Sequence, residues 1–455
     1  MKMKKHLFSA LLGLQCIALP CCAANSDFNI RDYGAVGDGI TLDTIAIQKA
    51  LDAAAVSGGK VYLPSGRYLS GTIQLRSGVT FYLEAGARLI GTTNLNEYRT
   101  PQSRQGKWQR ALIIADNADD FQVMGQGTID GNKVFDPTGE EHKRGPHAFN
   151  MVNCRKFTLR DFSIVDHANY AIFFQECDNV EIRNVKISNG WDGVHFRGQP
   201  GHWCHNVNII GCHFYTGDDC IAGDYWDRTV ISDCIINSVC NGIRLIGPAT
   251  HLIINNCLFY GPSTQPREQG RRNMLSGILL QPGAWSKTQG VVDDVFLADN
   301  TMHNVASPVT IWNNLGNTIG HITVSGLDAS GIDKAAFSAE SWTEAPITNL
   351  VLQNIHAEFN GGGEASQAQQ AVKKPGFDVR SLPAWGLYAR NVHELTIEDV
   401  RMSFATDDFR PVVVADGVEK LRIENFRYPS LPGVPISIFT TNVSQFIMNG
   451  TNVHQ

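Results

Sequence analysis

One short pattern recurs along most of the chain and limits the folds that it can adopt. It consists of an apolar residue, one spacer, a second apolar residue, two spacers that often hold Asn, Asp or Gly, and a further residue that is usually apolar. Eight clear copies are 157–162, 180–185, 207–212, 252–257, 295–300, 350–355, 395–400 and 421–426. The commonest step is about two dozen residues, which suits a coil of three short strands joined by turns. Helical periodicity is nearly absent, so the sequence predicts an all-β, right-handed parallel β-helix in which each coil stacks on the last.

The N-terminus has the pattern of an export signal. Lysines precede an apolar run from Leu7 to Leu19, which ends near small residues, so residues 1–24 are predicted to be a signal peptide. This run is shorter than a membrane-spanning helix, and no later stretch reaches that length. We therefore expect residues 25–455 to form a single β-helix domain in the periplasm or outside the cell. Cys21 and Cys22 leave a lipoprotein anchor as the alternative, although the preceding proline suits it poorly.

A β-helix needs a cap, because an open terminal coil would expose unpaired strand edges and the core. One amphipathic helix is placed to cap the first coil. Asp43 or Thr41 can serve as its N-cap residue. Its predicted apolar face comprises Ile45, Ile47, Ala50, Leu51 and Ala54. Residues 361–374 lack large apolar side chains except Val372 and are predicted to be a loop insertion, after which the repeat resumes.

Charge and cysteine content exclude several functions. The formal net charge is −6 and no polybasic block is present, which argues against a nucleic-acid partner or an anionic membrane. Eight cysteines follow the predicted signal, at positions 154, 177, 204, 212, 220, 234, 240 and 257. Several recur at the same place in successive coils, so we expect buried core thiols with at most one disulfide. No pair has zinc-site spacing, and we predict no metal.

A five-residue phrase recurs on four successive coils, starting at Asp192, Asp218, Asn241 and Ser276. Period-2 alternation places the third and fifth residues of each phrase in the core. It then predicts that His195, Ile221 and Arg244 face outward together. In this register Asp192, Asp218 and Asn241 lie at one level, with Asp219 one position later. Such an acidic cluster suits acid–base chemistry on a sugar linkage.

Several segments resemble the polygalacturonase family of glycoside hydrolases, family 28. They are 28–39, 71–75, 83–87, Asp192-Gly193 and Gly217-Asp-Asp-Cys-Ile-Ala222. The resemblance implies hydrolysis of a polysaccharide or oligosaccharide with inversion and without a cofactor. It also implies that Asp218 donates a proton to the glycosidic oxygen, while Asp192 and Asp219 activate water.

The chain departs from the family pattern in the next two coils. The family histidine aligns with Asn241, or with Cys240 if the register slips, and the family's Arg and Lys fall on Leu279 and Gln281. Those basic residues hold the carboxylate of galacturonate, and only Arg244 could recover such a contact. We therefore expect a neutral or differently substituted sugar as the substrate.

Six residues near the acidic strands are predicted to bind substrate, although each could instead serve packing or the surface. They are His195, Asn241, Arg244, Trp191, Asp224 and Trp226. Two alternative functions stay open. One is a β-helix polysaccharide lyase, in which the acids hold calcium and Arg244 is the base. The other is a non-catalytic glycan-binding β-helix.

Overall fold

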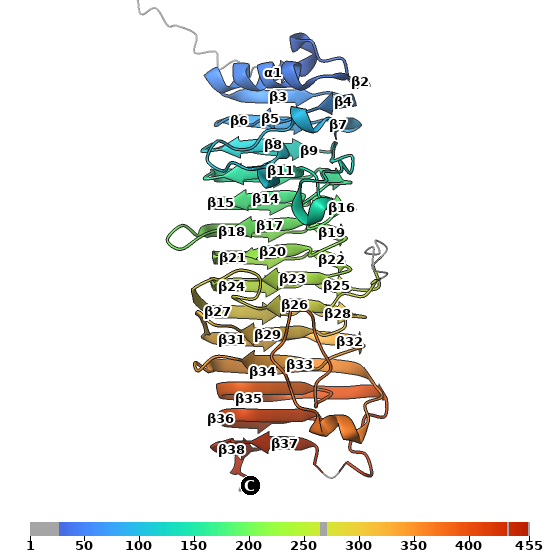
Figure 1. Ribbon diagram of the computed structural model, residues 1–455, viewed down its shortest axis with the longest axis vertical. Coiled ribbons are helices and arrows are strands. Elements are labelled where there is room, and N and C mark those ends of the chain that lie inside the picture. The colour runs from blue at the N-terminus through green and yellow to red at the C-terminus, as the bar shows by residue number, and fades with distance from the viewer. Residues whose placement is uncertain (1–26, 264–270, 435, 454–455) are drawn as a thin grey trace, which may run out of the picture.

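A computed structural model describes residues 27–263, 271–434 and 436–453 (Figure 1). The predicted signal peptide, 1–24, lies outside these residues. Short strands wind into a stack of coils, and strands of successive coils pair in parallel. Among the described strands, only β38 and β39 pair antiparallel. The molecule is thus a right-handed parallel β-helix, as the repeat predicts. No helix in the described ranges is long and apolar enough to cross a membrane.

Each coil contributes strands to three stacked sheets. Sheet 1 contains β5 (Ile73–Gln74), β8 (Ala111–Asp116), β11 (His147–Val152), β14 (Ile172–Gln175), β17 (Val194–Arg197), β20 (Ile221–Asp224), β23 (Asn241–Leu245), β26 (Ser276–Leu280), β29 (Val309–Asn313), β33 (Phe337–Ser341), β37 (Ile438–Thr441) and the first parts of β35 (Leu387–Thr406) and β36 (Val413–Glu424). Sheet 2 contains β1 (Asp27–Asn29), β3 (Gly59–Leu63), β6 (Val79–Leu83), β9 (Gln122–Gly125), β12 (Arg155–Arg160), β15 (Asp178–Arg183), β18 (Cys204–Ile210), β21 (Trp226–Ser232), β24 (Ala249–Asn255), β27 (Gly290–Ala298), β30 (Asn317–Ile319), β31 (His321–Ser325), β34 (Ile347–Gly361), later parts of β35 and β36, and β38 (Gln445–Met448) with β39 (Thr451–Asn452). Sheet 3 contains β2 (Asp38–Leu42), β4 (Gly66–Ser70), β7 (Ala87–Gly91), β10 (Thr128–Asp130), β13 (Ser163–Val165), β16 (Lys186–Ser188), β19 (His213–Thr216), β22 (Ile235–Ser238), β25 (Leu258–Tyr260), β28 (Thr301–His303), β32 (Asp328–Ile332) and the ends of β34 and β35.

The corner between sheets 2 and 3 explains the spacers of the repeat. From β12–β13 to β31–β32, two residues separate the strands at this corner. The first of the two has a φ between 51° and 71°, in the left-handed region that Asn, Asp and Gly tolerate best. In order along the chain, these residues are Asp161, Asn184, Gly211, Asp233, Asn256, Asp299 and Gly326. The second residue of each pair is buried, so the corner turns the chain and continues the core.

Inward side chains form ladders along the axis of the helix. Phe174 stacks on Phe196 with ring centroids 4.8 Å apart, and Phe196 stacks on Trp226 at 4.1 Å. The eight cysteines of the described residues are all buried and free, as expected for core thiols. Cys212 and Cys234 occupy the buried corner position of adjacent coils. These stacks form one continuous core from the first coil to the last.

Helix α1 (Thr44–Ser57) covers the N-terminal end of the stack (Figure 1). One residue of the predicted apolar face is wrong. Ile45 is 70% exposed, and Ala46 is buried in its place. Asp43 stands at the N-cap position without a capping hydrogen bond, because its carboxylate accepts from the backbone amides of Val36 and Gly37 instead. Thr41 belongs to β2.

Within the described ranges, five short 3₁₀ helices lie in the connections, namely η1 (Ile30–Tyr33), η2 (Leu95–Glu97), η3 (Lys107–Gln109), η4 (Glu140–His142) and η5 (Ala365–Gln369). The longest described connections join sheet 3 to sheet 1. They comprise 92–110, 131–146 and, at the C-terminal end of the stack, 362–386. The last one contains most of the predicted insertion 361–374 and crosses the front of sheet 1 toward β26 (Figure 1).

Candidate active site

The strand register differs by one residue from the predicted register. Val194 pairs with Ile221, and Ile221 pairs with Ile243, so Ile221 points into the core. Ala222 then lies between His195 and Arg244 on the outer face of sheet 1. Asp219, rather than Asp218, therefore lies level with Asp192 and Asn241, because a shift of one residue reverses every side chain of a strand.

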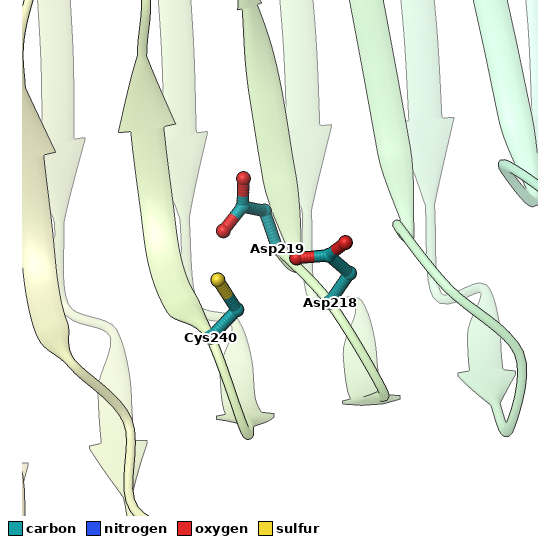
Figure 2. A group of neighbouring side chains, drawn as sticks. All are labelled: Asp218, Asp219 and Cys240. Carbon is teal, nitrogen blue, oxygen red and sulfur yellow. The ribbon is translucent and has the colours of Figure 1, made fainter. Parts of the chain in front are cut away.

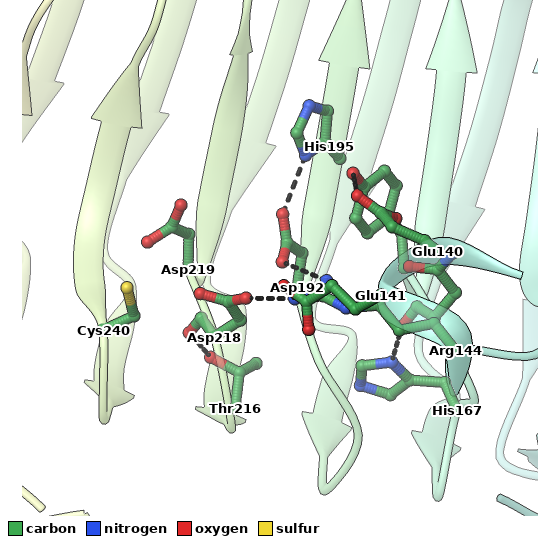
Figure 3. Close-up of polar contacts among 12 residues, drawn as sticks. Glu140, Glu141, Arg144, His167, Asp192, His195, Thr216, Asp218, Asp219 and Cys240 are labelled. Atoms are coloured by element: carbon green, nitrogen blue, oxygen red, sulfur yellow. Dashed lines mark hydrogen bonds and ion pairs between the residues drawn. The ribbon is translucent and has the colours of Figure 1, made fainter. Parts of the chain in front are cut away.

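The structure brings the three predicted catalytic aspartates together where sheet 3 turns into sheet 1 (Figure 3). Arg144, from the 131–146 connection, joins two of them. Its Nη2 donates to Asp218 Oδ2 at 2.6 Å, and its Nη1 lies 3.6 Å from Asp192 Oδ1. All four side chains are buried. A guanidinium shared between two buried carboxylates offsets part of their mutual repulsion.

Asp219 has a separate set of partners on the next coil. Its Oδ1 accepts from the backbone amide of Asn241 at 3.1 Å and from Asn241 Nδ2 at 2.8 Å. Its Oδ2 lies 3.4 Å from Arg244 Nη1, while Arg244 Nη2 donates to Gln281 Oε1 at 3.1 Å. The predicted binding residues Asn241 and Arg244 thus hold a catalytic candidate directly.

His195 orients Asp192 from the outer face of β17. Its Nε2 accepts from Arg197 Nε at 2.8 Å, so its Nδ1 carries the hydrogen and donates to Asp192 Oδ2 at 2.8 Å. Burial, aided by the charge of Arg197, lowers the pKa of His195 well below its ordinary value and keeps the ring neutral. Tyr170 stacks on the imidazole with centroids 4.3 Å apart, which fixes its orientation.

Electrostatics in this cluster favour retention of a proton. Burial raises the pKa of Asp192 well above its ordinary value, the charges of Asp218 and Asp219 raise it further, and Arg144 acts in the opposite direction. Burial also raises the pKa of Asp219, against the effect of Arg244. Because the carboxylates interact, their titrations belong to the group rather than to one residue. A carboxylic acid that stays protonated near neutral pH can act as a general acid.

Residues 28–259 match the protein family described as rhamnogalacturonase A/epimerase, pectate lyase-like. The chain belongs to this family. The "Probable rhamnogalacturonase A" of Aspergillus oryzae is 28% identical, over 86% of this chain and 83% of that protein. The "Polygalacturonase" of Persea americana is 22% identical, over 82% of this chain and 83% of that protein. An exopolygalacturonase from Thermotoga maritima shares the fold, with a TM-score of 0.63 at 17% identity, covering 83% of this chain and 92% of that one. These relatives confirm the resemblance to family 28, and the protein is a glycoside hydrolase.

In this rhamnogalacturonase-family chain, the structure places the three remaining predicted binding residues, Trp226, Trp191 and Asp224, in different surroundings. Trp226 is wrong as a binding residue, because it is fully buried in the core and its Nε1 donates to the Phe196 carbonyl at 3.1 Å. Trp191 lies beside the aspartates, under the guanidinium of Arg144 at 4.2 Å and the ammonium of Lys143 at 4.7 Å. Asp224 faces outward on β20, two residues beyond Ala222.

Among the described residues, Asp218, Asp219 and Cys240 form a group whose spacing could hold a metal ion (Figure 2). One ligand atom of each lies within 4.8 Å of the others. Burial raises the pKa of Cys240 well above its ordinary value, so the sulfur stays a thiol. A neutral thiol is a poor ligand for the hard cations that carboxylates prefer. The group does not suit a calcium or magnesium centre.

The sequence did not reveal three residues of the site. They are Arg144, Trp285, and Gln281 in its role as the hydrogen-bond partner of Arg244. The Trp285 ring lies 5.1 Å from the guanidinium carbon of Arg244. Arg144 and Trp285 belong to connections that occur once, so the repeat gives no reference position for them. The one available signal was charge, since Arg144 ends a run of five charged or histidine residues after Gly139.

Proposed function

We propose that the protein hydrolyses a glycosidic bond in a pectic polysaccharide or oligosaccharide with inversion, using Asp192, Asp218 and Asp219. The observation that carries this proposal is the convergence of three buried carboxylates from adjacent coils, two of them joined by Arg144. The activities for which the relatives are named support a pectic substrate. Hydrolysis with inversion needs one carboxylic acid and at least one carboxylate that activates water.

In the proposed mechanism Asp218 protonates the leaving oxygen, while Asp192 and Asp219 orient and deprotonate a water molecule on the opposite side of the sugar. Arg144 stabilises the carboxylate that Asp218 becomes when it gives up its proton. His195 holds Asp192 from behind through its Nδ1–H. Asn241 holds Asp219 in the same way through two N–H groups.

The sugar next to Asp219 is proposed to be neutral or substituted at its carboxylate. The family's two basic positions are Leu279 and Gln281 here. Arg244, the remaining cation on this side, already has its charge balanced by Asp219. A free uronate carboxylate would therefore find no unpaired cation among the described residues of β23 and β26.

Hydrolysis is favoured over the lyase alternative by the state of Arg244. Burial is the largest effect and opposes the charge of Arg244, but its neighbours together, Asp219 first among them, outweigh burial and raise the pKa of Arg244 above an already high value. A guanidinium held in this way cannot remove a proton from a sugar carbon. Because a lyase would need that step, Arg244 is better suited to positioning Asp219.

The direct test measures reducing-sugar release from a panel of pectic and neutral plant oligosaccharides by the mature protein and by Asp218→Asn. Asp233→Asn is the matched control, since Asp233 is exposed and its φ of 57° suits Asn equally well. The expected result is release by the wild type and the control, with loss in Asp218→Asn. Absence of release by all three proteins, or equal release by Asp218→Asn, would contradict the proposal.

Two further measurements test the assigned roles. NMR of the first product should find the anomer opposite to that of the substrate, and a retained configuration would exclude inversion. With an aryl glycoside whose phenol leaves without protonation, Asp218→Asn should recover activity, whereas Asp192→Asn should not. Recovery in the opposite order would exchange the two roles.

We also propose that residues 1–24 direct export and are removed. N-terminal sequencing of the protein from the culture medium or periplasm should then begin near residue 25. An intact N-terminus in a cytoplasmic fraction would argue against export.

A further inference from the structure

The outer face of sheet 1 is covered on the C-terminal side of the aspartates. In a bare β-helix, alternate side chains of this sheet would face solvent. Here they are buried on the three strands that follow β23, each at most 4% exposed. The buried outward residues are Leu279, Thr310, Trp312, Ser338 and Glu340.

The cover is the connection 362–386, which is held down by an ion pair between its Arg380 and the buried carboxylate of Glu340. Arg380 donates from both terminal nitrogens to Glu340, at 3.0 and 2.6 Å, and its guanidinium carbon lies 5.7 Å from the Trp312 ring centroid. Val379 joins an apolar cluster with Leu279 and Trp312. A bidentate pair on a buried carboxylate fixes a segment far more firmly than surface contacts do.

The tip of this connection reaches the catalytic coils. Phe377 packs on Trp285 with ring centroids 4.5 Å apart, and Trp285 lies over Arg244, which contacts Asp219. A continuous row of contacts therefore runs from Asp219 to the anchored segment. Trp285 is 56% exposed and Phe377 is 47% exposed, so both present aromatic surface at the far end of this row of contacts. Such surface suits the apolar face of a sugar ring.

The N-terminal side of the aspartates is covered as well. Asn150 Nδ2 donates to the Gln109 carbonyl at 2.8 Å, and the Trp108 ring lies 5.5 Å from that of Phe173. Both contacts come from the 92–110 connection, and Arg144 covers Asp192 and Asp218 from the 131–146 connection. A polysaccharide that extended along the stack of strands would therefore be blocked by protein on both the N-terminal and the C-terminal side of the aspartates.

From this arrangement we infer that the enzyme attacks the end of its chain, and that the 362–386 connection, with Phe377 against Trp285, is the wall that stops the polymer from passing. The inference rests on the proposed hydrolysis. A closed face admits a chain end but excludes an internal bond of a long polymer. The Arg380–Glu340 pair is then a positioning contact for the wall rather than part of the chemistry.

The test follows the viscosity and the reducing ends of a polymer that the wild type hydrolyses. End attack predicts short products from the first minutes and little loss of viscosity for each bond cleaved. The double variant Trp285→Ala/Phe377→Ala, and separately Glu340→Gln, should lower viscosity severalfold more for each bond cleaved. Phe296→Ala, on the exposed face of sheet 2, is the control and should match the wild type.

The outcomes separate this inference from the proposed function. No release of reducing ends by the wild type would overturn the proposed function, hydrolysis of a pectic substrate by the three aspartates. Release with a rapid fall in viscosity by the wild type would overturn only the inference of end attack. An unchanged product pattern in the folded double variant would overturn the assignment of the wall to Phe377 and Trp285. That variant changes exposed side chains, so the test remains valid if Glu340→Gln does not fold.

Discussion

Replacement of Asp224 by Asn should make the stability of the protein less dependent on pH. Asp224 is 6% exposed, and its Oδ1 has no hydrogen-bond partner among the described residues. Burial raises the pKa of Asp224 to about 6 from 3.8, against the charge of Arg197 on the neighbouring strand. Between pH 3.8 and about 6, Asp224 therefore keeps its proton in the folded protein, whereas it has lost that proton in the unfolded chain.

The size of the effect follows from this difference in proton affinity. A difference of about two pH units corresponds to about 3 kcal/mol of unfolding free energy. This contribution is fully present below the unfolded pKa of 3.8 and is lost as the pH rises through about 6. Between about pH 4.5 and about pH 7.5, roughly 2 kcal/mol of it disappears. For a chain of this length, that amounts to a change in Tm of about 2 °C.

Calorimetric unfolding of wild type and Asp224→Asn at these two pH values measures the effect. The Tm of the variant minus that of the wild type should rise by about 2 °C from the lower to the higher pH. Comparing the two pH values cancels any contribution of the amide that does not depend on pH. Asp38→Asn is the control, because hydrogen bonds from Thr41 and Ile40 lower the pKa of Asp38 and it stays ionised throughout. A difference for Asp224→Asn that is constant with pH would refute the reasoning, since it would mean that the carboxylate is solvated or paired.

Three other predictions concern the Arg144 guanidinium, two glycines and the buried thiols. Arg144→Met should lower kcat by about 100-fold and move the acidic limb of the pH–rate profile to higher pH, because the carboxylates lose the cation that favours their ionised forms; an unmoved limb in a steady-state pH series would argue against this role. Gly223→Ala should abolish soluble protein, since an added Cβ would lie 1.8 Å from the Phe196 carbonyl oxygen, whereas Gly201→Ala, with nothing within 4 Å, should cost about 1 kcal/mol in thermal unfolding. The eight described cysteines should react with a thiol reagent only after denaturation, and a reductant should leave the Tm unchanged; rapid labelling of the native protein would contradict their burial.

The fold could be predicted from the sequence because each coil repeats the same physical requirements. Apolar alternation identifies the inward side chains, and the Asn, Asp or Gly at the corner marks the left-handed turn. The register at Asp218 could not be obtained in this way. Cys220, Ile221 and Ala222 are all small or apolar, so alternation does not decide which of them faces inward. Two adjacent aspartates then allow the phrase to be aligned on either one.

The site was predictable where it lies on the repeat and not where it lies on single connections. His195, Asn241 and Arg244 occupy repeat positions, and the structure brings them to the aspartates. Arg144 reaches the same aspartates from a connection that no other coil shares, so only tertiary contacts identify it. Trp226 was misjudged because a bulky aromatic near a turn suits sugar stacking as well as it suits the core.

The two-residue corner between sheets 2 and 3 also affects how such a protein can evolve. A residue added there would break the left-handed turn and shift every ladder that follows, so this edge of the stack resists insertion. The corner between sheets 3 and 1 carries no such constraint and holds connections of very different length. Because the aspartates lie at that permissive edge, selection can lengthen or exchange the connections around them while the stack of coils stays unchanged. New substrate preferences can therefore arise at little cost to folding.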